Sequence, residues 1–265
     1  MQEFRIRPAI RQYDDCAQFV SDLGITGDDL ILTNEYIFRP HFESMRLPCP
    51  VLYQERYGSG EPSDDMFRAL LADAACPHGR IIAIGGGTIL DLAKLLALKN
   101  RDQVAALYAG EVVPEKACPL IAVPTTCGTG SEVTNVSVLS LVSLGTKKGL
   151  AHDALYPDMV ALVPDLVKGL PYRFFATSSL DALIHVVESA LSPKATPFSK
   201  AYAYQAIATI LAGYRVIARD GEEARTPLLG DFLIASTMAG ISFGNAGCAA
   251  VHALSYPLGA KYHIA

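Results

Sequence analysis

The sequence predicts an α/β domain with a mostly parallel sheet, followed by an all-helical domain. Up to about Pro171, short apolar runs rich in Ile, Val and Leu alternate with amphipathic segments, which is the rhythm of a Rossmann-like fold built from βα units. From Pro171 to Ala265 this alternation stops, and long helical stretches replace it. We therefore expect an α/β domain over residues 1–170 and a helical domain over residues 171–265.

Each expected element has a local signal. Apolar runs bounded by turn residues predict strands at 30–33, 50–54, 80–84, 119–123, 133–141 and 159–163. Helical spacing of apolar residues predicts helices at 63–75 and 88–98, which open on Pro62-Ser63 and Gly87-Thr88. Beyond Pro171 the expected helices are 172–190, 199–219, 225–241 and 246–256, with a proline-rich turn at 192–197.

Composition argues against several classes of protein. A chain of 265 residues with 51% hydrophobic and 18% charged residues is too apolar to be disordered, and 22 Lys and Arg against 27 Asp and Glu do not suit nucleic-acid binding. No uninterrupted apolar run approaches the ~20 residues of a membrane-spanning helix, and the N-terminus lacks the apolar segment of a secretory signal. The six cysteines are scattered, as in reduced proteins. We expect a soluble, cytoplasmic protein.

The turn Gly85-Gly86-Gly87-Thr88 follows an apolar strand and opens a helix. Backbone N–H groups at the positive end of a helix dipole bind phosphate, so this turn suits the pyrophosphate of a dinucleotide. It lacks the G-x-G-x-x-G pattern, and tight packing alone would also explain the glycines. Asp91 and Lys94, one turn further along, would then be simple surface charges, although Asp91 also suits the helix dipole.

A second loop rich in glycine and hydroxyl residues, 124–132, also follows a predicted strand. Because parallel strands end at the same edge of a sheet, we expect this loop and the triple glycine to share the edge where open α/β folds bind ligands. The alternative is a solvent-exposed turn that uses Gly and Thr for its geometry.

The predicted helix 172–190 is apolar on almost every side, yet Asp181, His185 and Glu188 fall on one stripe at i, i+4 and i+7. Unpaired buried carboxylates and imidazoles are costly, so these groups pair internally, face a cleft or bind a metal. His252 lies in another small-residue helix of the same region. An Asp with two His side chains suits a divalent metal, whereas a hydrogen-bonded pair and a neutral core histidine remain as alternatives.

These motifs together resemble the iron-activated (group III) alcohol dehydrogenases over essentially the whole chain. The resemblance rests on four ordered segments: Gly85 to Thr88 with Asp91 and Lys94, 124–132, Asp181-x-x-x-His185-x-x-Glu188, and Gly247-x-x-x-x-His252. It implies an NAD(P)-dependent, metal-dependent oxidoreductase of dehydroquinate synthase-like architecture. It also implies a divalent metal, Fe(II) with Zn(II) as the alternative, a small alcohol or aldehyde substrate, and a homodimer.

Carried over to this chain, the resemblance assigns the cofactor site residue by residue. Gly86, Gly87 and Thr88 would hold the pyrophosphate of NAD. The family's acidic residue that accepts the adenosine ribose hydroxyls corresponds here to Asn34, which is followed by Glu35. The remaining cofactor residues implied by the resemblance are Asp91, Thr125, Thr126, Thr129, Thr134 and, near the nicotinamide ribose, Lys148.

The resemblance also assigns the metal site, to Asp181, His185 and His252, which match three of the family's four ligands. The fourth would be a histidine one residue beyond Ala265, and the remainder of the family's helical domain would follow it. His263 would take the place of this fourth ligand only if the C-terminal end of the chain were rearranged. Tyr256 stands where several relatives have a second active-site histidine. A truncated, inactive nucleotide-binding fragment is therefore an alternative to the enzyme.

Within the family, segments 124–138, 58–63 and 251–257 most resemble bacterial enzymes that interconvert 4-hydroxybutyrate and succinate semialdehyde. Another short alcohol or diol is the alternative substrate. Recognition of 4-hydroxybutyrate requires a group for its distal carboxylate, for which Arg173 and Lys200 are candidates, although a solvated surface would explain both.

Overall fold

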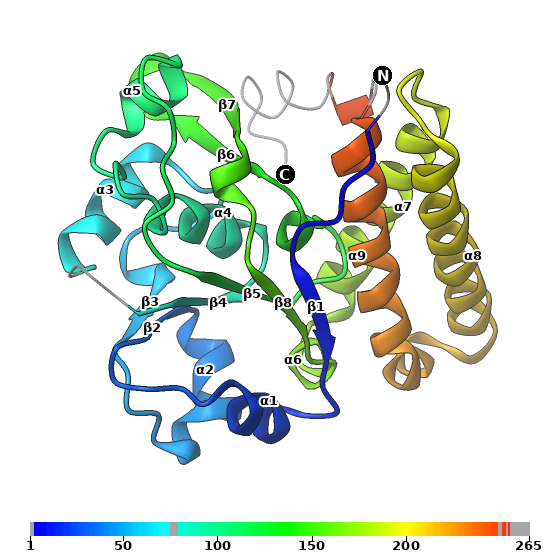
Figure 1. Cartoon of the computed structure of the whole chain (residues 1–265). Coiled ribbons are helices and arrows are strands. Elements are labelled where there is room, and N and C mark those ends of the chain that lie inside the picture. Colours follow the sequence, from blue (N-terminus) through cyan, green and yellow to red (C-terminus); the bar gives the residue numbers. More distant parts are fainter. Residues whose placement is uncertain (1–2, 75–78, 249–250, 253, 255–265) are drawn as a thin grey trace.

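The computed structural model describes residues 3–74, 79–248, 251, 252 and 254 and confirms an α/β sheet followed by a helical C-terminal region (Figure 1). Six strands, all paired in parallel, form the main sheet in the order β1-β8-β5-β4-β2-β3. Their bounds are β1 (Ala9–Gln12), β2 (Leu30–Thr33), β3 (Val51–Tyr53), β4 (Ile81–Gly85), β5 (Leu120–Pro124) and β8 (Met159–Leu162). Every residue of the four inner strands is buried, as a parallel sheet covered on both faces requires.

Helices cover both faces of this sheet because alternate strand residues point to opposite sides. Ile82 and Ile84 of β4 join the hydrophobic core beneath α1 (Cys16–Leu23) and α2 (Glu35–Phe42), whereas Ile81 and Ala83 join the core beneath the helices on the other face. That second face carries α3 (Asp64–Asp73), α4 (Gly87–Leu96) and α5 (Val104–Ala109), as Figure 1 shows.

A separate two-stranded antiparallel hairpin, β6 (Val136–Leu141) and β7 (Thr146–Ala151), packs against α4. The predicted strand 133–141 is confirmed over 136–141. Val133 belongs instead to a 3-10 turn, Ser131–Val133, and the strand pairs with β7 outside the parallel sheet. An alternating pattern predicts a half-buried strand but does not identify its partner.

The structure contains further elements that the sequence pattern did not predict. β1 and β7 are short and mostly exposed, and α2 contains Pro40 in its interior, which argued against a helix there. The other short elements that were not predicted are α1, α5, α6 (Asp165–Lys168), η1 (Glu43–Met45), η2 (Gln54–Arg56), η4 (Val142–Leu144) and η5 (Asp153–Leu155). These segments are too short for hydrophobic periodicity to identify them.

Three long helices form the C-terminal bundle: α7 (Tyr172–Leu191), α8 (Pro197–Asp220) and α9 (Leu229–Ala246). A capping box of Thr196 and Ser199 starts α8, with Pro197 at its first position. The predicted helix 225–241 begins instead as a 3-10 turn, η6 (Glu222–Leu228), which contains Pro227. The division into two domains at residue 170 stays a prediction.

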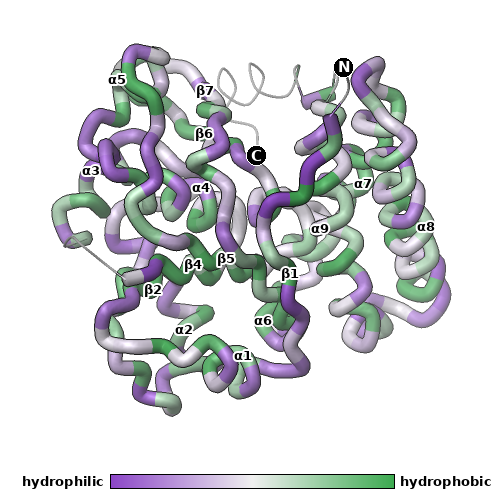
Figure 2. Tube along the Cα trace, viewed as in Figure 1, coloured by the Kyte–Doolittle hydropathy of each residue, from purple (hydrophilic) through white to green (hydrophobic). Residues whose placement is uncertain are grey.

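By length and composition alone, α7 and the segment Glu222–Ala246 could each cross a membrane. Both are core helices of this bundle, because α7 and α9 pack against each other and against α8. Figure 2 shows hydrophobic colouring along much of both helices. Phe175 of α7 meets Phe232 of α9 edge to face, with ring centroids 4.8 Å apart.

The predicted helix 246–256 is described only in part. Val251, His252 and Leu254 are helical, and Tyr256 and His263 lie outside the described residues. The five described cysteines, Cys16, Cys49, Cys118, Cys127 and Cys248, are free thiols.

Candidate active site

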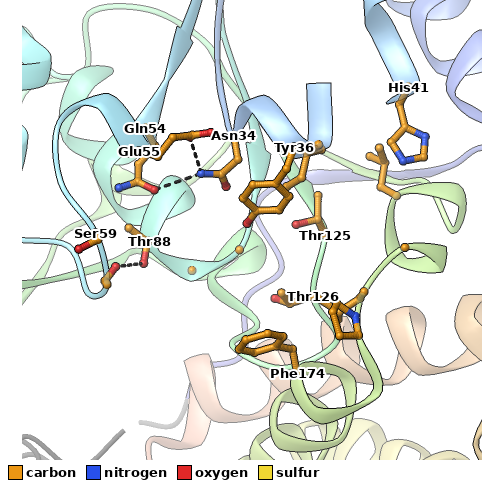
Figure 3. A pocket seen from close by; sticks show the side chains of 18 of the residues that line it. Asn34, Tyr36, His41, Gln54, Glu55, Ser59, Thr88, Thr125, Thr126 and Phe174 are labelled. Atoms are coloured by element: carbon orange, nitrogen blue, oxygen red, sulfur yellow. Dashed lines mark hydrogen bonds between the residues drawn. The ribbon is translucent and has the colours of Figure 1, made fainter. Parts of the chain in front are cut away.

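A cavity of about 1110 Å³ opens at the carboxyl ends of β2, β4 and β5 (Figure 3). Six of the predicted cofactor residues line it: Asn34, Gly86, Gly87, Thr88, Thr125 and Thr126. The two loops expected to share one edge of the sheet therefore do so. Gly58, Ser59 and Gly60 of the predicted segment 58–63 also line it. Further lining residues were not predicted from the sequence, among them Tyr36, His41, Gln54, Glu55 and Phe174.

The N-terminus of α4 faces this cavity with free backbone donors. Gly86 is the N-cap residue, and no side-chain hydrogen bond caps the helix. The first backbone hydrogen bond of the helix runs from Leu90 N–H to the carbonyl of Gly86. The N–H groups of the first turn therefore have no partner within the helix. Together with the positive end of the helix dipole, they form an anion site suited to a pyrophosphate.

Glycine is required at this turn because neighbouring side chains fill the space a Cβ would need. A Cβ on Gly85 would lie 2.4 Å from Cδ1 of Ile89, and one on Gly87 would lie 2.9 Å from Cγ2 of Thr129. Thr88 Oγ1 donates to the carbonyl of Gly60 at 3.2 Å, which ties the 58–60 loop to the rim of the cavity.

Four predicted cofactor residues do not line the cavity, and their cofactor roles stay predictions. Thr129 packs against Gly87. Lys148 is exposed on β7. Asp91 and Thr134 belong instead to a buried polar network that surrounds Lys94.

This network fixes the loop after β5 to α4. Lys94 Nζ donates to Ser131 Oγ at 2.7 Å, to Thr134 Oγ1 at 3.2 Å and to the carbonyl of Val136 at 2.6 Å. Ser131 Oγ in turn donates to Asp91 Oδ1 at 2.6 Å. Burial lowers the pKa of the Lys94 ammonium, against the opposing charge of Asp91. Lys94 and Asp91 are therefore buried structural groups and not the surface charges of the alternative interpretation.

The same loop connects the sheet to the helical bundle. A Cβ on Gly128 would lie 2.6 Å from the carbonyl oxygen of Ser178 on α7, and one on Gly130 would lie 2.5 Å from Cα of Gly240 on α9. Thr237 of α9 donates to Glu132 at 2.9 Å. Burial raises the pKa of the Glu132 carboxyl. The backbone of the loop therefore touches two helices of the bundle directly.

Gly128→Ala should destabilise the protein by about 1–3 kcal/mol, because the new methyl group meets rigid backbone at Ser178. Urea denaturation measures the effect. Gly230→Ala is the matched control: its Cβ would lie 3.5 Å from Cγ of Pro164, an ordinary contact, and it should lose no stability. Equal stability of Gly128→Ala and the parent chain would contradict the close packing of this loop on α7.

The predicted metal ligands lie together at the bundle. Asp181 and His185 come from consecutive turns of α7, and His252 comes from the segment after α9. Asp181 Oδ2 lies 3.7 Å from His185 Nδ1, and Asp181 Oδ1 lies 3.4 Å from His252 Nε2. The two imidazole rings stack with centroids 4.1 Å apart, and Phe243 stacks on the other side of His185 at 4.4 Å. Donor atoms roughly 3–4 Å apart match the ligands of one transition-metal ion.

The pKa values of the two histidines in this cluster are shifted in opposite directions. Burial lowers the pKa of His185, against the opposing charge of Asp181. The hydrogen bond with Asp181 raises the pKa of His252, and a hydrogen bond with Glu188 adds to this effect. The contact between His252 Nδ1 and Glu188 Oε2 is 2.5 Å. Glu188 is therefore placed to orient the His252 ring, as a carboxylate behind a metal-binding histidine does.

These residues fit a divalent metal. His185 Nδ1 is buried and has no hydrogen-bond partner among the described residues, which is costly unless a further group binds it. Cys248 Sγ joins the nitrogen atoms of His185 and His252 in a group whose donor atoms lie within 4.8 Å of one another. A carboxylate with imidazoles suits Fe(II) or Zn(II), and a thiol beside them favours Zn(II).

One helix joins the cavity to this cluster. Phe174 of α7 lines the cavity, and Asp181 lies two turns further along the same helix, roughly 10 Å at the rise of an α-helix. Thr125 and Thr126 line the cavity as well, and Gly128 of the same loop packs on α7 at Ser178. The cavity and the ligand cluster are therefore neighbours.

A glycine-rich helix N-terminus lies beside an Asp-His-His cluster, an arrangement that suits an oxidoreductase with a dinucleotide and a metal. The chain belongs to the iron-containing alcohol dehydrogenase family. The family description "Iron-containing alcohol dehydrogenase" matches residues 14–164, and "Fe-containing alcohol dehydrogenase family, C-terminal" matches residues 175–265.

Two curated relatives illustrate the range within the family. The 4-hydroxybutyrate dehydrogenase of Clostridium kluyveri is 46% identical over 265 residues, which cover all of this chain and 71% of that enzyme. The long-chain-alcohol dehydrogenase 1 of Geobacillus thermodenitrificans is 43% identical over 190 residues, 70% of this chain and 47% of that enzyme.

Solved structures show the same fold. Sulfoacetaldehyde reductase from Bifidobacterium kashiwanohense, in complex with NAD+, superposes with a TM-score of 0.83 at 25% identity, over all of this chain and 72% of that one. The iron-containing alcohol dehydrogenase of Thermotoga maritima gives 0.82 at 25% identity, over all of this chain and 75% of that one.

Proposed function

We propose that this protein is an NAD-dependent, metal-dependent alcohol dehydrogenase that interconverts 4-hydroxybutyrate and succinate semialdehyde. The observation that supports it is the placement of Phe174 at the cavity and of Asp181 and His185 further along the same helix. The 46% identity with the 4-hydroxybutyrate dehydrogenase of Clostridium kluyveri supports the proposed substrate. We further propose that the enzyme is cytoplasmic and works as a homodimer. Light scattering of the purified protein would test the oligomeric state.

In this proposal each group of residues has a distinct task. The first-turn N–H groups of α4 bind the pyrophosphate and fix the position of the dinucleotide. Asp181, His185 and His252 hold the divalent ion, which when bound supplies Lewis acidity that lowers the pKa of the substrate alcohol. Glu188 accepts the Nδ1 proton of His252 and so leaves Nε2, on the Asp181 side of the ring, as the ligating atom.

No described residue is assigned to the distal carboxylate of the substrate. Arg173 is exposed at the start of α7 and Lys200 is half-buried on α8, and neither lines the cavity. Their role in substrate recognition stays a prediction.

The test is metal analysis, NAD titration and turnover on the purified 265-residue chain. We expect one divalent ion per chain, saturable NAD binding, and a kcat/KM for 4-hydroxybutyrate that exceeds those for 1,3-propanediol and 1-butanol. A higher kcat/KM for 1,3-propanediol or 1-butanol would contradict the proposed substrate, whereas the proposed enzyme class would stand.

The second candidate is a nucleotide-binding fragment without activity. One finding favours it: the whole chain matches 71% of the length of the Clostridium kluyveri enzyme. Bound NAD without stoichiometric metal and without turnover of any short alcohol would decide for this candidate.

A further inference from the structure

We propose that Glu55 is the residue that selects NAD over NADP in this chain, and that Asn34 acts by holding Glu55 in place. The inference rests on the proposed function, since it concerns the dinucleotide site. It addresses a difficulty of the sequence: the position where relatives are expected to have an acidic residue holds a neutral amide, Asn34.

The strand order brings Glu55 to the required place. β2 lies next to β4, which carries the phosphate-binding turn, and β3 lies on the other side of β2. Glu55 comes just after the carboxyl end of β3 and lines the same cavity as Asn34 and the glycine turn (Figure 3). Dinucleotide folds recognise the adenosine ribose beyond the end of the strand next to the phosphate-binding strand, which is β2 here. Glu55 comes from β3, one strand further out, and its carboxylate reaches the end of β2 at Asn34.

Two hydrogen bonds hold the Glu55 carboxylate in a fixed orientation. Asn34 Nδ2 donates to Glu55 Oε2 at 2.9 Å, and the backbone N–H of Glu35 donates to Glu55 Oε1 at 2.6 Å. The second bond places the carboxylate at the N-terminus of α2, where the helix dipole favours negative charge. Asn34 also donates to Gln54 Oε1 at 3.2 Å, so its amide is used within this group.

The carboxylate keeps the capacity to bind a ribose. An ionised carboxyl group has about four acceptor sites, and only two are used by the described residues. A 2′-hydroxyl group would donate to one of the others, whereas a 2′-phosphate in the same place would meet a negative charge.

No lysine or arginine side chain lines the described cavity to compensate that charge. Two arginines close to Asn34 and Glu55 in sequence have other contacts: Arg39 pairs with Glu35 at 2.5 Å, and the Arg56 guanidinium lies 4.9 Å from the centre of the Tyr53 ring. The site therefore offers an acceptor for a hydroxyl group and no cation for a phosphate.

Calorimetric titration of the whole chain with NAD and with NADP tests this inference without reference to turnover. We expect the parent protein to bind NAD at least about tenfold more tightly than NADP. Glu55→Gln should lower that ratio by about tenfold, mainly through tighter NADP binding, because the amide removes the charge and keeps the size. Glu55→Arg should reverse the preference, a gain that misfolding cannot imitate.

Glu35→Gln is the matched control, because Glu35 is the adjacent acidic residue, paired with Arg39, and does not line the cavity. It should leave the ratio unchanged. An unaltered ratio in Glu55→Gln together with no reversal in Glu55→Arg would overturn the inference, as would an equal effect of Glu35→Gln. Absence of binding by either dinucleotide to the parent chain would instead overturn the proposed function.

Discussion

His185→Ala should abolish retention of the divalent metal and leave the affinity for NAD nearly intact. His185 is the most enclosed member of the ligand cluster, between Asp181, Phe243 and His252, and its Nδ1 atom has no hydrogen-bond partner among the described residues. Loss of an orienting residue near a metal typically weakens binding by about 10–100-fold, and loss of a ligand itself should exceed this. Metal analysis after gel filtration and calorimetric NAD titration measure the two quantities.

The matched control for this variant is His152→Ala. His152 is a histidine outside the cluster, where its Nδ1 accepts a backbone N–H from Ala154. It should retain metal at the level of the parent protein. Unchanged metal content in His185→Ala would show that the Asp181, His185 and His252 cluster is a hydrogen-bonded structural group, which is the alternative interpretation of the stripe on α7.

Gly87→Val should have the converse effect, a loss of NAD affinity of at least about 100-fold with metal content preserved. Gly87 is the first residue of α4 and lines the cavity. Its Cβ would already lie 2.9 Å from Thr129 Cγ2, and the valine methyl groups would occupy the space in front of the free N–H groups. The same titration and metal analysis apply.

Gly27→Val serves as the control, because Gly27 is exposed in the loop before β2, at the opposite edge of the sheet from the cavity. Its Cβ would meet only the carbonyl of Pro48, at 3.7 Å. NAD affinity should be unchanged there. Undiminished NAD binding by Gly87→Val would remove the glycine turn from the cofactor site.

The local features of this chain could be predicted because their signals are local. The strands 30–33 and 80–84 and the start of α7 follow from runs of apolar residues and their boundaries, and these agree with the structure within a residue or two. The glycine turn is recognisable because a helix N-terminus after a strand is contained in a few consecutive residues. The spacing of Asp181 and His185 required only the period of one helix.

The elements that were not predicted depend on contacts between distant segments. β7, with the sequence TKKGLA, has no apolar pattern of its own and is a strand because it pairs with β6. In the same way α2 forms in spite of Pro40, since Phe38 and Phe42 pack in the core beneath the sheet. Tertiary packing outweighs a weak or contrary local preference.

By itself, the sequence determined the inner strands of the sheet and the long helices, the glycine turn before α4 and the spacing of Asp181 and His185 within α7. Only the tertiary structure decided which polar residues meet. It placed Asp91 and Thr134 in a buried network with Lys94, and Glu55 beside Asn34 at the cavity. The physical reason is that the pairing of β2 with β3 brings Asn34 and Glu55 together at the ends of these strands. The periodicity of one segment does not reveal which strand it pairs with or in which register.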